Sequence, residues 1–383
     1  MFDHSGDAAQ TLSNARIVTP NGLFEGGLAI EDGRISGLTQ ASDGRDLGGA
    51  FLIAGIIDLH TDHVERHTHP RVGVIWPSLP ALLAYDAVII SGGTTTVYDS
   101  LSVGAAMQKP ERRELFEPLV ASLRDAIAQD LFRAEHLLHL RCEISDPATP
   151  ALVNGSINLP ETRLVSVMDH TPGDRQSPDI DKWFWHMIRD MEVTEEEGRP
   201  MMDALFERSR AHGAAVRAHV TQTAFAAKVP LMSHDDRTVE HVDEALAEGC
   251  TISEFPTTLE AARHARAEGM GIVVGAPNYL RGGSQSGNVA VAELLAEGLA
   301  DVLASDYIPR SPLDAAFAIA ADPALPHDLP QALAMVTEAP ARMTCLNDRG
   351  RIAEGLRADL VAVRVIGGQP VVEAAWRAGR QVF

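Results

Sequence analysis

The chain has 383 residues, of which 45% are hydrophobic and 22% charged, so it can bury a large core and has no composition typical of disorder. Its formal net charge of -21 argues against a nucleic-acid partner, because phosphate backbones are bound by dense Lys and Arg stripes, and none occurs here. No run reaches the roughly 18 apolar residues that span a bilayer, and the first ten residues lack the pattern of a signal peptide. We therefore expect a cytoplasmic globular protein that does not bind a membrane.

Both ends of the chain predict short β-strands. Residues 1–54 alternate apolar and polar side chains between Gly, Asp and Asn turns, and residues 346–383 have the same character. We expect these two segments to pair into one small β domain, and residues 55–345 to form the domain between them.

The central segment alternates short apolar runs with amphipathic helical stretches, a pattern that predicts an α/β fold with a parallel sheet. In the helical stretch 111–127, apolar residues recur at every fourth position from Leu115 to Ile127, and a later stretch ends at Gly249, as helices often do. There are eight apolar runs, the number that a closed (β/α)8 barrel requires. They cover residues 55–60, 94–99, 137–143, 164–170, 229–234, 251–255, 271–277 and 301–306.

One connection, residues 172–200, is too long for a simple loop between strand and helix, and it carries Trp183, Phe184 and Trp185. It predicts either a lid over the mouth of the barrel or a surface pair of helices that packs its own aromatic side chains. The sequence leaves both alternatives open.

Polar side chains that can bind a metal follow nearly every apolar run. The strands of a (β/α)8 barrel end at the face that carries the active site, so these side chains should meet at one rim. A single His or Asp after a strand is usually a helix cap or a hydrogen-bonded buried group, and only the convergence of many favours a metal site. The residues concerned are His60, Asp62, Asp99, Glu143, Asp169, His170, His234, Asp235, Asp236, Glu254, Asn278 and Asp306.

The spacing of these residues allows two metal ions. His60 and Asp62 occupy positions i and i+2 of one strand, so they point to the same side and can hold one ion together. Glu143 is placed to bridge that ion to a second one, held by His170 or His234. We expect two divalent ions per chain, zinc, manganese or iron, because these metals share imidazole and carboxylate ligands.

Asp306 follows the last run, and we expect it to contact the metals and to act as the catalytic proton acceptor. A metal lowers the pKa of its bound water to about 7, and a neighbouring carboxylate can take the proton. The predicted reaction class is therefore metal-assisted hydrolysis.

A Gly-rich segment, residues 275–288, follows the seventh run and predicts a phosphate-binding loop. Glycines permit tight turns whose N–H groups face an anion, an arginine supplies a planar fork, and hydroxyl and amide groups add neutral donors. Such a segment is often an ordinary turn, but its place after a barrel strand favours the binding role. The candidate substrate-binding residues are Asn278, Arg281, Gly282, Gly283, Ser284, Ser286, Asn288 and, from the third run, Arg141.

Three further histidines follow the first run. His63 should face away from the metal pair, and His67 and His69 should lie in the loop beyond it as rim residues. Arg66 and Arg71 lie close enough in the sequence to reach a phosphate.

Ordered motifs along almost the whole chain resemble the amidohydrolase superfamily, and in particular its members in phosphonate utilisation through the carbon–phosphorus lyase pathway. The resemblance implies a (β/α)8 metal-dependent hydrolase barrel flanked by a small β-sandwich built from both termini. It also implies hydrolysis of a ribose 5-triphosphate, such as α-D-ribose 1-methylphosphonate 5-triphosphate, to the 5-phosphate and pyrophosphate. The motifs are GIIDLHTD, LHLRCE, VSVMDHTPGDRQ, SHDD, EFPTTLEAA, GAPNYLRGGSQSGN, ASDYIP, LNDRG and WRAGRQVF.

The resemblance leaves one metal ligand open. Superfamily members commonly carry HxH at the first strand and histidines after strands five and six, whereas this chain reads HTD at residues 60–62 and Glu254 after strand six. Either His170 or Glu254 then completes the second metal site. The chain also has His63 and Tyr85 where the resemblance leads us to expect Asn and His, so a related enzyme for another phosphorylated sugar stays an alternative.

Two other functions are compatible with the barrel. A deaminase or cyclic amidase would use the same metals on a C–N bond, but it would not need an arginine in the Gly-rich segment. A metal-free scaffold would lack the candidate ligands, which are present. We expect a small phosphorylated ribose as the binding partner, and a homodimer is possible for a barrel of this size.

Overall fold

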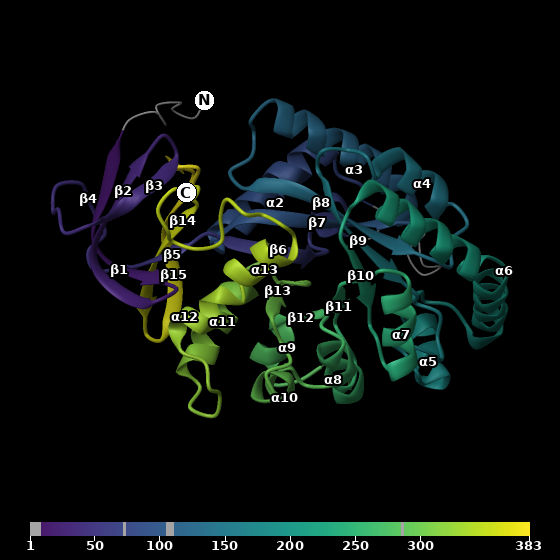
Figure 1. Cartoon of the computed structure of the whole chain (residues 1–383). Helices are drawn as coiled ribbons and strands as arrows, with labels where there is room; N and C mark the ends of the chain where they lie inside the picture. Colours follow the sequence, from purple (N-terminus) through teal and green to yellow (C-terminus); the bar gives the residue numbers. More distant parts are fainter. Residues whose placement is uncertain (1–8, 72–73, 105–110, 285–286) are drawn as a thin grey trace.

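The computed structural model describes residues 9–71, 74–104, 111–284 and 287–383. Eight parallel strands, β6 to β13, form one sheet in which each strand lies beside the next in the chain (Figure 1). They coincide with the eight apolar runs, so the prediction of an eight-stranded α/β barrel is confirmed. The strands are β6 (Ile56–Thr61), β7 (Thr94–Val103), β8 (Glu135–Glu143), β9 (Thr162–Met168), β10 (Leu231–His234), β11 (Ile252–Glu254), β12 (Gly271–Gly275) and β13 (Val302–Ala304).

The first and last strands of this sheet meet beside the predicted site. Thr61, at the end of β6, forms a parallel bridge with Asp306, two residues after β13. Asp62 N donates to Asp306 O at 3.0 Å, and Asp306 N donates to His60 O at 2.9 Å. Barrel closure therefore places His60, Asp62 and Asp306 side by side at one rim.

The two ends of the chain share a second, mixed sheet. Its strand order is β16-β15-β14-β5-β1-β2-β3, with β4 paired to β1, and β5 and β14 join the two ends through an antiparallel pairing. The sheet encloses its own core, which includes Leu12, Leu52 and Trp376. The small β domain built from both termini is thus confirmed, while its exact limits stay a prediction. Its strands are β1 (Gln10–Thr19), β2 (Gly22–Glu31), β3 (Arg34–Thr39), β4 (Arg45–Asp46), β5 (Phe51–Ala54), β14 (Leu360–Ile366), β15 (Gln369–Arg377) and β16 (Arg380–Gln381).

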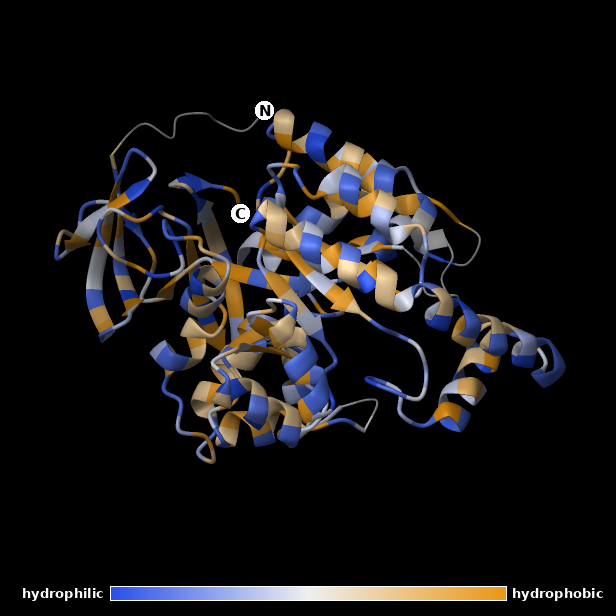
Figure 2. Cartoon of the chain, turned by 45° about the vertical axis from the view of Figure 1, so that its right-hand side comes forward, coloured by the Kyte–Doolittle hydropathy of each residue, from blue (hydrophilic) through white to orange (hydrophobic). Residues whose placement is uncertain are grey.

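Helices surround the barrel, and their surfaces mix apolar and polar residues around a largely apolar set of strands (Figure 2). In α3, Leu115 is buried but Ile127 is 37% exposed. A four-residue step overshoots one helical turn, so the apolar row drifts out of the core. The described helices are α1 (Val64–Thr68), α2 (Ser78–Ser91), α3 (Glu111–Ala128), α4 (Thr149–Ser156), α5 (Ile180–Asp190), α6 (Glu195–Ala227), α7 (Val239–Ala247), α8 (Leu259–Ala267), α9 (Ala276–Arg281), α10 (Val291–Ala296), α11 (Ser311–Ala321), α12 (Leu329–Ala334) and α13 (Glu338–Met343). Among these described helices, none is both long and apolar enough to cross a membrane.

The long connection at residues 172–200 contains α5 and the start of α6. Phe184, Met187 and Ile188 of α5 are buried in a cluster of their own, whereas Trp185 is 56% exposed. Gly198 of α6 permits close packing, because a Cβ atom there would lie 2.4 Å from Ile188. The helical pair packs its own apolar cluster, as one of the two alternatives predicts, and the alternative of a lid over the mouth of the barrel stays a prediction.

Candidate active site

The carboxyl ends of the barrel strands open into a cavity of about 790 Å³. A smaller cavity of about 110 Å³ adjoins it, and both are lined by Gln176, Phe255, Asp306 and Tyr307. The larger cavity brings together every residue predicted to bind a metal. These residues are His60, Asp62, Glu143, His170, His234 and Asp306.

One carboxylate, that of Glu254, contacts two imidazoles in this site. Glu254 Oε1 lies 2.6 Å from His60 Nδ1, and Oε2 lies 2.5 Å from His234 Nδ1. The two rings stack with centroids 5.9 Å apart. Burial opposes the charge on Glu254, but His60 and His234 outweigh it and hold the pKa of Glu254 well below its usual range. Glu254 thus fixes both rings and leaves the Nε2 atom of each for another partner.

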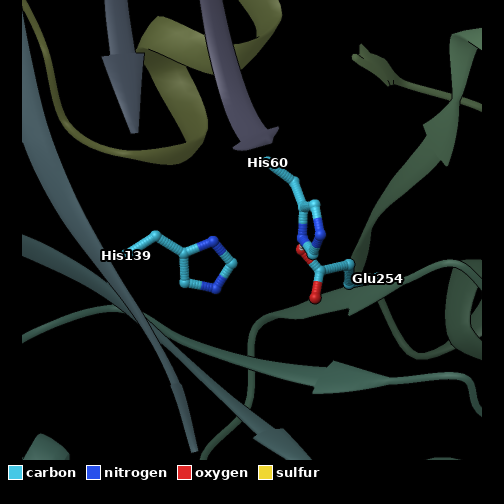
Figure 3. Close-up of side chains that lie close together, drawn as sticks. All are labelled: His60, His139 and Glu254. Carbon is cyan, nitrogen blue, oxygen red and sulfur yellow. Dashed lines mark hydrogen bonds and ion pairs between the residues drawn. The ribbon is translucent and has the colours of Figure 1, made fainter. Parts of the chain in front are cut away.

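His139 lies beside this pair, across from His60 and Glu254 (Figure 3). Its Nδ1 is 3.1 Å from Leu59 O, and its Nε2 is 2.9 Å from Ser166 Oγ. Burial lowers the pKa of His139 to about 3, so the ring is neutral at physiological pH. His60, His139 and Glu254 each offer a ligand atom, and these atoms all lie within 4.8 Å of one another, but both ring nitrogens of His139 already have protein partners.

A second group of donor atoms faces the cavity. His170, His234 and Asp235 each offer a ligand atom, and these atoms all lie within 4.8 Å of one another. His234 Nε2 is 3.3 Å from Asp235 Oδ2. Glu143 Oε2 lies 2.6 Å from His170 Nδ1, and Glu143 Oε1 accepts from Ser145 Oγ at 2.8 Å. Glu143 therefore orients His170, and the bridging role expected of it stays a prediction.

Three residues of the rim have left-handed backbone conformations. Asp235, Phe255 and Asp306 have φ between 54° and 57°, which is unfavourable for side chains other than glycine. The backbone N–H of each donates to a carbonyl of the neighbouring strand at 2.8–2.9 Å. Such conformations persist where the surrounding structure fixes them, and they cluster at active sites.

Asp306 lines both cavities and is half-buried. Burial raises its pKa above the ordinary value, and the carboxylate of Asp62 adds to this effect, although His60 opposes it. A carboxylate with a raised pKa accepts a proton more readily near neutral pH.

Arg141 is the positive group nearest the candidate metal ligands in sequence, two residues before Glu143. Its side chain is buried and lines the larger cavity, and neither Nε nor Nη1 meets a hydrogen-bond acceptor within the described residues. A buried N–H donor without a partner is costly unless a ligand satisfies it. Arg66 lines the same cavity, whereas Arg71 lines neither.

Most of the Gly-rich segment borders the smaller cavity. Asn278, Arg281, Gly283, Ser284 and Asn288 line it, and Ser286 lies outside the described residues. The Asn278 side chain is used within the segment, because Oδ1 accepts from Val291 N at 3.0 Å.

The glycines of this segment differ from expectation. Gly282 N donates to Tyr279 O at 3.0 Å and Gly283 N donates to Asn278 O at 2.9 Å, so both amides close the end of α9. They end a helix rather than facing an anion. Arg281, at the end of α9, donates from Nη1 to Tyr307 Oη at 3.2 Å.

Other polar residues at strand ends have structural roles. Asp99 pairs with His136 at 2.8 Å, and Asp236 accepts from Arg175 Nη1 at 2.7 Å. His63 packs near Tyr85, with ring centroids 6.4 Å apart, and does not line the cavity, as predicted. Burial lowers the pKa of His63 to about 4.

Sequence reasoning missed two members of the site. His139 was not considered, although it shares a strand face with Arg141 and Glu143 through i, i+2, i+4 alternation. Asp235 belongs to the metal-capable residues at strand ends, but strand alternation alone predicts that it points away from His234. Its left-handed φ of 57° changes that direction.

A parallel barrel whose strand ends converge on imidazoles and carboxylates is the architecture of metal-dependent hydrolases. A model described as "Amidohydrolase family" matches residues 179–383. The chain is also 38% identical over 379 residues to the α-D-ribose 1-methylphosphonate 5-triphosphate diphosphatase of Escherichia coli (strain K12), covering 97% of this chain and 100% of that protein. The chain therefore belongs to the amidohydrolase family, and it is a hydrolase.

Solved structures share the fold at low sequence identity. One crystal structure of an amidohydrolase has a TM-score of 0.63 and 15% identity, with 98% of both chains covered. The 5-methylcytosine deaminase of Klebsiella pneumoniae has a TM-score of 0.62 and 18% identity, with 97% of this chain and 98% of that chain covered. These similarities support the fold alone.

Proposed function

We propose that the protein hydrolyses a ribose 5-triphosphate, α-D-ribose 1-methylphosphonate 5-triphosphate in the first instance, to the 5-phosphate and pyrophosphate. The full-length similarity to the Escherichia coli diphosphatase supports this substrate. The observation that carries the proposal is Arg141, a buried cation whose Nε and Nη1 meet no acceptor among the described residues and which shares a cavity with the candidate metal ligands. Such a group fits an anionic substrate and has no purpose in a site for a neutral amide.

The donor set fits two divalent cations. We assign His170, His234 and Asp235 to one ion, because their donor atoms already lie together and face the cavities. We assign His60, Asp62 and Asp306 to the other, because they meet at the barrel seam. Zinc, manganese and iron all accept these ligands.

We assign Glu254 an orienting role rather than that of a ligand. Two donors on one tetrahedral ion, each about 2.1 Å from the metal, lie about 3.4 Å apart. The contacts of Glu254 with His60 and His234 are 2.6 and 2.5 Å, which are hydrogen-bond distances. A carboxylate that binds Nδ1–H and directs Nε2 to a metal is a common arrangement. His170 then completes the second site.

The reaction transfers the α-phosphoryl group to water. The water oxygen forms a bond to the α-phosphorus. The bond from that phosphorus to the oxygen shared with the β-phosphorus breaks, and pyrophosphate leaves with the electron pair. Asp306 takes the proton of the attacking water. Arg141 stabilises negative charge on the phosphoryl oxygens, and Arg281, Ser284 and Asn288 hold the phosphate chain in the smaller cavity. Bound divalent ions would supply Lewis-acid activation of the water and the phosphoryl group.

The test combines elemental analysis of the purified protein with product detection. We expect two metal ions per chain and release of pyrophosphate from ribose 5-triphosphates. Ammonia release from cyclic amides or aminated bases, without pyrophosphate, would identify a C–N hydrolase instead. Two metals without any phosphorus chemistry would reject the diphosphatase proposal and leave the metal site standing.

A further inference from the structure

The wall of the larger cavity formed by α5 has no role in the reaction described above. Trp183, His186, Met187 and Asp190 line the cavity from this helix. Their positions follow the i, i+3, i+4, i+7 spacing, so they form one continuous helical face. The cavity is thus bounded by strand ends on one side and by a single helix face on another.

The position of α5 is fixed relative to the candidate metal ligands. The connection that leads into it is anchored by Arg175, which is buried and donates to Asp236 Oδ1 at 2.7 Å and to Glu244 Oε2 at 2.8 Å. Arg175 Nη1 also lies 3.3 Å from the carbonyl oxygen of His234. These contacts anchor the connection, and the apolar cluster packs α5 against α6.

The chemistry of this wall differs from that of the strand ends. The arginines of the two cavities come from outside α5: Arg66, Arg141 and Arg281. The α5 face contributes an indole, an imidazole, a thioether and a carboxylate, but no Lys or Arg side chain. A wall without a cation is unsuited to phosphate, whereas an indole face beside hydrogen-bonding groups suits a neutral hydroxylated ring.

Two polar groups of the face are available to a ligand. No hydrogen bond joins the Trp183 indole N–H or the His186 ring nitrogens to another residue in the described part of the chain. Asp190 Oδ1 already accepts a hydrogen bond from Arg189 Nε at 3.2 Å, so it has less capacity to bind a ligand. Trp183 is half-buried and its ring is held by the apolar cluster, which gives it a fixed surface.

We propose that the α5 face binds the pentose of the substrate, with Trp183 packed against the ring and His186 hydrogen-bonded to a hydroxyl group. This rests on the proposed function, because it takes the substrate to be a phosphorylated sugar. This arrangement fixes the orientation of the substrate. The pentose lies against α5, the α-phosphorus lies at the strand ends, and the phosphate chain extends into the smaller cavity beside α9. The α5 face then distinguishes a sugar phosphate from phosphate alone.

The test compares binding of ribose 5-phosphate with binding of inorganic phosphate to the metal-loaded protein by calorimetry. We expect wild-type protein to prefer ribose 5-phosphate, and Trp183→Leu to reduce that preference about tenfold while leaving phosphate binding unchanged. His186→Ala, at an exposed position, should also reduce the preference for ribose 5-phosphate. The matched control is Trp185→Leu, which alters an indole of the same helix that faces solvent and should change neither affinity.

Equal binding of the two ligands by wild-type protein, or an unchanged preference in both Trp183→Leu and His186→Ala, would overturn the proposal. Turnover is measured separately, as pyrophosphate release from ribose 5-triphosphates. Preference for the sugar phosphate without pyrophosphate release would reject the proposed function alone. Pyrophosphate release with an unchanged preference in both variants would reject the role of α5 alone.

Discussion

Glu254 holds two imidazoles from different strands with its two oxygen atoms. It lies on β11, between His60 on β6 and His234 on β10, and is completely buried. A histidine at this position could bind one metal, whereas a carboxylate orients two histidines at once. Replacing Glu254 should therefore weaken the binding of both metal ions.

The variant Glu254→Gln tests this role. An amide offers one oxygen and one NH₂ group, so it can satisfy Nδ1–H of only one histidine at a time. We expect the affinity for both ions to fall by about 10- to 100-fold, measured by titration with a metal indicator. Loss of only one ion, with the other bound at wild-type affinity, would identify Glu254 as a ligand. Glu268→Gln, at an exposed position, is the control.

The carboxylate of Asp306 should be essential for turnover. Its pKa is raised by burial and by Asp62, and its place at the barrel seam is fixed by backbone hydrogen bonds on both sides. We expect Asp306→Asn to reduce the rate of pyrophosphate release by about 10²- to 10⁴-fold. Metal content is measured on the same sample. Full turnover with both metals bound would show that another group takes the proton.

At the level of elements, the sequence predicts the barrel strands well because each one coincides with a short apolar run. The positions of the six predicted metal ligands follow from the polar residues at or directly after these runs. The anchoring of the connection before α5 does not, because Arg175 reaches Asp236 and Glu244 across about sixty residues of chain. The helix-closing role of Gly282 also depends on where α9 ends, which local composition does not fix.

The buried pair of Arg175 and Asp236 should stabilise the fold strongly. Removing one partner leaves a buried charge without compensation, which costs about 3 kcal/mol or more. We expect Arg175→Met to lower the free energy of unfolding in urea by about that amount. Arg263→Met is the matched control, because Arg263 pairs with Glu297 on the exposed surface and should change stability by less than about 1 kcal/mol. Equal effects of the two variants would contradict an anchoring role for Arg175.

A cluster between α2, β7 and β8 should make stability depend on pH. Burial opposes protonation of His136, but Asp99 and Asp86 outweigh it and raise the pKa of His136 to about 9. Because this pKa is above the unfolded value of about 6.5, the contribution of His136 is fully present below pH 6.5 and is lost as pH rises through 9. We expect His136→Gln to flatten that part of the pH profile of unfolding, whereas His212→Gln, at an exposed position, leaves it unchanged. A wild-type profile without a decline from pH 6.5 to 9 would contradict the charged state of His136.

At the scale of the whole molecule, the fold concentrates negative charge at one end of the barrel. The two cavities are lined by the carboxyl groups of Asp62, Glu143, Asp235 and Asp306, and Glu254 is buried beside them, in a chain whose formal net charge is already -21. The substrate proposed for this rim is itself a polyanion. Cations are therefore needed to bind the substrate as well as to activate water.

The same charge distribution predicts that metal ions stabilise the whole fold. An ion that binds only the folded state at one hundred times its Kd adds about 2.7 kcal/mol to the free energy of unfolding. We expect a chelator to lower the thermal midpoint and abolish turnover, and zinc, manganese or ferrous ions to restore both. In a variant that combines His170→Ala with His234→Ala, the chelator should have a smaller effect, because one of the two assigned ions is no longer held. A chelator that leaves the midpoint of the wild-type protein unchanged would show that the rim binds no metal tightly.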